Sequence, residues 1–144
     1  MNLVLDACVA AKWFLPHRGE TLVEEALAIL SRFARGDIGL FVPDLFWPEV
    51  GNIFWKAARL CRMTGASAKN AIGSLAELNL PTSPSQGLLT DAFAIAACLD
   101  RTVYDSIYVA LAVASGTTLV TADQRLVNAV AAHLPVRWLG SFAI

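Results

Sequence analysis

The chain has 144 residues and a formal net charge of −1, and 56% of its residues are hydrophobic against only 16% charged. An ordinary soluble domain is about 45–50% apolar and about 25% charged. The composition therefore excludes an intrinsically disordered chain, and the balanced charge gives no overall attraction for nucleic acid. The length suits one domain, so we expect residues 1–144 to form a single domain. The apolar excess indicates a surface covered by a partner or a second copy.

Short apolar runs alternate along the chain with stretches in which apolar residues recur at helical spacing. The runs predict strands at Leu3–Leu5, Leu40–Val42, Leu80–Thr82, Thr118–Thr121 and Val136–Trp138. The periodic stretches predict helices at Glu20–Arg35, from the N-cap Asp44 to Cys61, and at Ala66–Leu78, Gln86–Asp100, Tyr104–Ser115 and Asp123–Ala132. Strands that alternate with helices in this way predict a parallel sheet covered on both faces.

Neither a membrane span nor a signal peptide is expected. The apolar segment Ser106–Ala122 is shorter than the about 20 residues that a spanning helix needs. Asp6 interrupts the apolar start, which no basic region precedes. Cys8, Cys61 and Cys98 are odd in number and share no CxxC spacing. We expect them to be reduced thiols, packed as small core residues, in a cytoplasmic protein.

Four acidic residues stand at positions where strands and helices meet. Asp6 follows the first strand, and Asp123 follows the strand at Thr118–Thr121. Ligands of open α/β sheets bind at the carboxyl ends of the strands, which is where these two residues are expected. Asp105 opens a helix, and Glu49 lies in the first turns of another. Taken singly, Asp105 and Asp123 are best explained by helix capping, whereas Asp6 and Glu49 lie in apolar surroundings where an unpartnered charge is costly.

Several carboxylates at one sheet edge repel each other and raise each other's pKa. A hard divalent cation such as Mg²⁺ or Mn²⁺ removes that repulsion, because it prefers oxygen ligands. The chemistry that such a site supports is phosphodiester hydrolysis.

Four segments together resemble the PIN-domain family and, within it, the VapC-type ribonuclease toxins of toxin–antitoxin pairs. They read LVLDACVAAKWF (3–14), PEVGNIFWKA (48–57), TVYDSIYVALA (102–112) and LVTADQRL (119–126). The resemblance covers essentially the whole chain. It implies a Rossmann-like α/β/α sandwich with a parallel five-stranded sheet, an acidic pocket for Mg²⁺ or Mn²⁺, and cleavage of RNA.

The resemblance also implies roles for individual residues. Asp6 and Asp105 would ligate the metal, and Glu49 would ligate it or orient the attacking water. Asp123 would ligate a second metal or act through water, and the Thr121 hydroxyl would hold a carboxylate. The family usually has serine or threonine two residues after the first aspartate, where this chain has Cys8, whose thiol is a poorer hydrogen-bonding group.

The expected partners are an RNA substrate, a cognate antitoxin and a second copy of the chain. An antitoxin arginine could bridge two carboxylates of the pocket, and the resemblance implies an antitoxin segment that wraps the toxin. Two-fold symmetry is the commonest closed arrangement, so we expect a homodimer. Trp13, Phe14, Phe46 and Trp47 are the candidates for an apolar groove beside the pocket.

A local basic group could supply contacts that the overall charge does not. Lys56, Arg59 and Arg62 recur every third residue on one side of a predicted helix, as a solvated face or as phosphate contacts. Lys12 follows the first carboxylate and could likewise contact phosphate or be an ordinary surface lysine. Trp55 belongs with these arginines, a combination that suits a protein interface.

Three other functions compete with this interpretation. A phosphotransfer aspartate, as in haloacid dehalogenase-like phosphatases, needs a second aspartate where Cys8 stands. Dinucleotide binding lacks a GxG motif. A PIN domain kept as an RNA-binding or protein-interaction module with little nuclease activity remains the alternative, and loss of an acid would indicate it.

Overall fold

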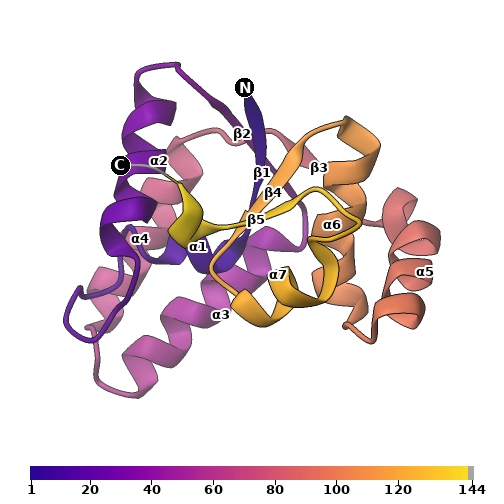
Figure 1. Ribbon diagram of the computed structural model, residues 1–144. Coiled ribbons are helices and arrows are strands. Elements are labelled where there is room, and N and C mark those ends of the chain that lie inside the picture. Colours follow the sequence, from indigo (N-terminus) through magenta and orange to yellow (C-terminus); the bar gives the residue numbers. More distant parts are fainter. Residues whose placement is uncertain (143–144) are drawn as a thin grey trace.

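The computed structural model describes residues 1–142 as a parallel β-sheet between two layers of helices (Figure 1). The strands are β1 (Asn2–Leu5), β2 (Gly39–Pro43), β3 (Thr82–Ser83), β4 (Thr118–Thr121) and β5 (Val136–Trp138). The helices are α1 (Ala7–Ala11), α2 (Val23–Ala34), α3 (Phe46–Arg59), α4 (Gly65–Glu77), α5 (Leu89–Leu99), α6 (Val103–Ser115) and α7 (Gln124–Val130). Two 3₁₀ turns lie at Gln86–Leu88 and Leu139–Ser141.

The strand order is β3-β2-β1-β4-β5, and every neighbouring pair is parallel. The predicted α/β fold with a five-stranded parallel sheet is therefore confirmed. The chain builds the sheet from β1 outwards to β3, then crosses back to add β4 on the other side of β1. The order thus reverses between β1 and β4, and this is the position where sheets of this kind bind ligands.

Helices cover both faces of the sheet, which explains the continuous apolar strands. In Figure 1, α5 and α6 lie on one side of the sheet and α2 and α4 on the other. Leu3, Val4 and Leu5 of β1 are all buried, as expected for a central parallel strand. Tyr108 of α6 and Phe54 of α3 are among the largest fully buried side chains. No helix in residues 1–142 is long and apolar enough to cross a bilayer.

The region between β1 and α2 differs most from the sequence-based prediction. The short helix α1 was not predicted, and the helix predicted from Glu20 begins only at Val23. Leu22 has a left-handed backbone with φ of 57°, which prevents the helix from extending towards residue 20. Glu20 is thereby free to form tertiary contacts of its own.

Three further expectations are corrected by the structure. Asp44 is not the N-cap of α3, because its carboxylate accepts hydrogen bonds from the backbone and hydroxyl of Ser85. The predicted helix Gln86–Asp100 is divided into a 3₁₀ turn and α5. Cys61 and Cys98 are exposed rather than core residues.

Candidate active site

The candidate site lies at the carboxyl edge of the sheet, where β1 and β4 end side by side. Asp6 directly follows β1, and Thr121 is the last residue of β4. Leu5 pairs with Val120, so the parallel register places the two strand ends level with each other. Helix α6 leads into β4, and its first turn therefore brings Asp105 to this same edge.

The Asp6 carboxylate is oriented from two sides. The hydroxyl of Thr121 donates a hydrogen bond of 2.7 Å to Oδ2, and the backbone N–H of Cys8 donates one of 3.3 Å to Oδ1. The second bond makes Asp6 the N-cap of α1. Because Thr121 is fully buried, its hydroxyl is a rigid donor. The side chain of Asp6 is thus held in one orientation at the end of the sheet.

Asp123 is connected to Asp6 through Thr121. The Asp123 backbone N–H donates a hydrogen bond of 3.0 Å to the same Thr121 hydroxyl oxygen. Its Oδ1 accepts bonds of 3.0 and 3.3 Å from the N–H groups of Arg125 and Leu126, so Asp123 caps α7. These bonds use one carboxylate oxygen, and Oδ2 receives no hydrogen bond from residues 1–142.

Asp105 has no capping role, although capping was one interpretation of its position. The N-cap of α6 is Thr102, whose hydroxyl accepts a 3.1 Å hydrogen bond from the Asp105 backbone N–H. Burial raises the pKa of the Asp105 carboxyl group and outweighs the Thr102 hydroxyl and the charge of Arg101, which lower it. A partly buried acid whose pKa is raised by burial gains from a bound cation.

Glu49 reaches the site from α3. Its Oε2 accepts a 2.9 Å hydrogen bond from the Tyr108 hydroxyl of α6. Sequence reasoning missed Tyr108, although it lies three residues after Asp105 and shares a helix face with it.

The acids influence one another's protonation. Burial is the main cause that raises the pKa of Asp6, Asp105 and Glu49, in the case of Glu49 to about 7. Nearby negative charge adds to this effect. Asp105 raises the pKa of Asp6, both raise that of Glu49, and Asp123 raises that of Asp105. The four carboxylates therefore form one electrostatically coupled group.

The donor atoms of this group suit a hard divalent cation. Within residues 1–142, no three His, Cys, Asp or Glu side chains lie close enough to hold one ion together. Mg²⁺, however, usually takes one or two carboxylates and completes its coordination with water and substrate phosphate. Asp6 and Asp105 supply such a pair of oxygen donors, and their mutual repulsion favours a cation between them. The roles of all four acids as ligands remain predictions.

Cys8 lies two residues after Asp6, where the resemblance to PIN domains leads us to expect a hydroxyl. Its Sγ accepts a 3.4 Å hydrogen bond from the Ala122 backbone N–H and lies 3.7 Å from Oγ1 of Thr121. Burial, and secondarily the Asp6 charge, raise the pKa of this thiol far above its usual range. The thiol therefore stays neutral and fills the position as a weak acceptor.

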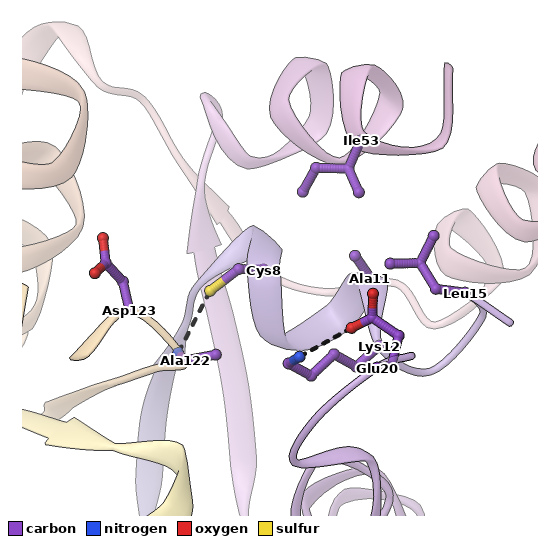
Figure 2. Close-up of a pocket in the computed structure, with 8 residues that line it drawn as sticks. All are labelled: Cys8, Ala11, Lys12, Leu15, Glu20, Ile53, Ala122 and Asp123. Atoms are coloured by element: carbon purple, nitrogen blue, oxygen red, sulfur yellow. Dashed lines mark hydrogen bonds and ion pairs between the residues drawn. The ribbon is translucent and has the colours of Figure 1, made fainter. Parts of the chain in front are cut away.

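A hollow of about 260 Å³ lies beside Asp123, the one of the four acids that lines it (Figure 2). Cys8, Ala122 and Asp123 stand at one end of the hollow, and Lys12 and Glu20 at the other. Apolar side chains, among them Ile53 of α3, line the space between them.

Lys12 is largely buried, and its Nζ lies 3.0 Å from Oε2 of Glu20. Sequence reasoning placed Glu20 inside a helix and so missed its ion pair with Lys12.

The aromatic groove predicted beside the pocket is only partly present. Trp13 is buried, and its Nε1 donates a 2.8 Å hydrogen bond to the Ala26 carbonyl, while Phe46 is fully buried in the core. Neither side chain is accessible to a partner, because both are packed inside the protein. Phe14 and Trp47 are partly exposed and remain candidates.

Comparison with known proteins gives a consistent result. The PIN domain family model matches residues 3–132. Ribonuclease VapC3 of Pyrobaculum aerophilum is 33% identical over 128 residues, which cover 88% of this chain and 92% of that protein. VapC ribonuclease Mb0985 of Mycobacterium bovis is 34% identical over 97 residues, which cover 67% of this chain and 75% of that protein.

Solved structures show the same fold at lower sequence identity. PAE2754 from Pyrobaculum aerophilum has a TM-score of 0.69 at 21% identity, over 98% of this chain and 85% of that chain. VapBC2 from Rickettsia felis, bound to a DNA fragment from its promoter, has a TM-score of 0.65 at 12% identity, over 96% of this chain and 98% of that chain.

Proposed function

Because this chain belongs to the PIN-domain family, we propose that it is a divalent-metal-dependent endoribonuclease and the toxin of a VapBC-type toxin–antitoxin pair. The Asp6 carboxylate carries this proposal. It stands at the end of β1, is oriented by Thr121, and has its pKa raised by burial and by Asp105. A cation at this place offsets the repulsion and makes the ionised form stable.

Each acid has its own task in this proposal. Asp6 and Asp105 would hold Mg²⁺ or Mn²⁺, which would stabilise negative charge on the phosphate and lower the pKa of bound water. Glu49, with a pKa of about 7, is suited to take a proton from the attacking water. Tyr108 donates to its Oε2, which leaves Oε1 as the better placed atom to accept the proton. Asp123 has Oδ2 available to orient water or substrate.

The experiment is RNA cleavage by the purified chain with Mg²⁺ or Mn²⁺ and with chelator, followed by mapping of new 5′ ends. Asp6→Asn and Asp105→Asn should each reduce the rate at least about a hundredfold, since each removes charge that holds the metal. Asp37→Asn is the control, because Asp37 forms an exposed ion pair with Arg35 away from the site. Undiminished cleavage in chelator, or a fully active Asp105→Asn variant, contradicts the proposal.

A PIN domain that binds RNA or protein without cleaving it is the second candidate. The observation in its favour is that no three acids in residues 1–142 lie within reach of a single ion. The same assay separates the two functions, because an inert module gives no new 5′ ends with any divalent cation.

We also propose two protein partners. An antitoxin would place an arginine among the carboxylates and so compete with metal and phosphate; the Rickettsia felis neighbour is a VapBC structure. A second copy of the chain would form a two-fold homodimer. Co-purification with the product of the adjacent gene tests the antitoxin, and light scattering of the isolated chain tests the dimer, which a monomer at high micromolar concentration contradicts.

A further inference from the structure

The hollow beside Asp123 continues along α3. A second hollow, of about 380 Å³, shares Leu15, Glu20 and Ile53 with the first. The two hollows therefore adjoin, and together they are here called the α3 groove, whose lining runs from Asp123 to Arg62. Asn52, Lys56 and Arg62 give its far part a polar and cationic lining.

One side of α3 connects the candidate site to this groove. Glu49, Asn52 and Lys56 are spaced i, i+3 and i+7, which places them along the same side of the helix. At a rise of 1.5 Å per residue, Glu49 and Lys56 are separated by about 10 Å along the axis. About three stacked nucleotides span that distance at 3.4 Å each.

The groove is more cationic than the rest of this nearly neutral chain. Glu20 bridges two cations, with Oε2 at 3.0 Å from Lys12 and Oε1 at 3.3 Å from Arg62. Lys56 is exposed and forms no ion pair within residues 1–142. Beyond Asp123, the charged residues that line the groove are therefore three cations and one acid: Lys12, Lys56, Arg62 and Glu20. This excess attracts a polyanion towards a pocket whose own charge is negative.

An aromatic platform stands beside the groove, because Trp55 lies one helical turn after the groove residue Asn52. Trp55 is 57% exposed, and the guanidinium of Arg59 lies 5.5 Å from its ring centroid. Exposed tryptophan and stacked arginine beside a cationic track are the elements by which proteins hold single-stranded nucleic acid. A helix from a protein partner would instead favour a wholly apolar groove with i, i+3, i+4 pockets, whereas four of the eight residues that line the far part of this groove are polar or charged.

We propose that the α3 groove binds the single-stranded RNA that flanks the cleaved bond. Lys56 contacts a backbone phosphate, Lys12 and Arg62 supply positive charge ordered by Glu20, and a base stacks on Trp55. The assignment rests on the proposed ribonuclease function, because it takes the acids as the point where the strand is cut. It adds the direction in which the strand leaves the site.

The test measures RNA binding, so that it does not depend on cleavage. In an Asp6→Asn background, a short fluorescein-labelled oligoribonucleotide of mixed sequence is titrated by fluorescence anisotropy at several salt concentrations. Lys56→Met should weaken binding several-fold and reduce the slope of log K against log salt by about 0.7, the contribution of one phosphate contact on a single strand. Trp55→Ala should weaken binding without changing the slope.

Arg35→Met is the matched control, since Arg35 is an exposed cation at the opposite edge of the sheet. Lys56, Trp55 and Arg35 are all exposed, and thermal melting by circular dichroism confirms that each variant is folded.

The proposal is overturned if both Lys56→Met and Trp55→Ala bind RNA with the affinity and the salt dependence of the parent protein. The proposal is also overturned if these variants bind RNA normally but no longer bind the antitoxin, because that result would assign the groove to a protein. A different result is that the wild-type chain cleaves no RNA while Lys56→Met still weakens RNA binding. That result would contradict the ribonuclease function but would support RNA binding in the α3 groove.

Discussion

The Tyr108 hydroxyl donates a 2.9 Å hydrogen bond to Oε2 of Glu49 and thereby connects α6 to α3 across the candidate site. Burial, and then the charges of Asp6 and Glu49, raise the pKa of Tyr108 far above its usual range. The tyrosine is therefore a permanent donor. Its bond favours the ionised form of Glu49 and partly offsets the effect of burial on that carboxyl group.

Tyr108→Phe should move the pH dependence of cleavage to higher pH. The variant loses the bond that lowers the pKa of Glu49, so this pKa should rise above about 7. If ionised Glu49 accepts the proton, the alkaline plateau of kcat/KM should survive while its midpoint rises. A pH–rate profile of both proteins measures this, and an unchanged midpoint would show that Glu49 does not set it. The lost hydrogen bond should also cost about 1 kcal/mol of stability.

The metal-free protein should lose stability as the pH rises through the mildly acidic range. The pKa of Glu49 goes from its ordinary 4.5 in the unfolded chain to about 7 in the folded protein, so the folded state binds more protons between these values. The free energy of unfolding must then fall as the pH rises across that window. Asp6 and Asp105, whose pKa values are also raised, contribute with the same sign.

Urea denaturation in chelator at several pH values measures this dependence. Glu49→Gln should make it shallower. Mg²⁺ should restore stability at neutral pH and bind more weakly as the pH falls, because protons compete for its ligands. Stability independent of pH from 4.5 to 7 would contradict the raised pKa of Glu49.

Thr121→Val should weaken metal binding about 10- to 100-fold, the usual effect of removing a residue that orients a ligand. Valine has nearly the same shape as threonine but removes the 2.7 Å hydrogen bond to Asp6. Isothermal titration with Mn²⁺ gives the affinity. Thr117→Val is the control, since the Thr117 hydroxyl contacts only Ser115 among the described residues. Equal Mn²⁺ affinity in both variants would mean that Thr121 does not position Asp6.

Cys8→Ser should retain activity or increase it up to about tenfold, because a hydroxyl is a better partner than a thiol for the Ala122 N–H and the Thr121 hydroxyl. Cys8→Ala removes the acceptor and should be less active than Cys8→Ser. Kinetics on one RNA substrate compare the two. Lower activity in Cys8→Ser than in Cys8→Ala would show that the thiol itself is required.

A thiol-labelling reagent at neutral pH should modify Cys61 and Cys98 long before Cys8. The first two are exposed, whereas burial raises the pKa of Cys8 far above its usual range and keeps it protonated. Mass spectrometry of labelled peptides over time gives the order of modification. Early labelling of Cys8 would contradict the environment described here.

The sheet and its acidic edge could be predicted because they depend on local signals. Asp6 follows an uninterrupted apolar run, and parallel strands bring their carboxyl ends together whatever the details of the loops. Glu20 could not be placed in this way, since its partner Arg62 lies 42 residues away and its freedom depends on the left-handed backbone at Leu22. The N-cap of α6 was missed because Thr102 and Asp105 both suit a helix start.

The two outer strands have a consequence for how copies of this chain can meet. β3 has two residues and β5 three, so neither edge offers a backbone long enough to continue the sheet into another molecule. If copies of this chain associate as proposed, they should therefore meet through helices, where α5 and α6 expose Phe93, Tyr104 and Val113. Contact through side chains depends on shape and can be disrupted one residue at a time, whereas strand pairing is indifferent to sequence and prone to open-ended growth.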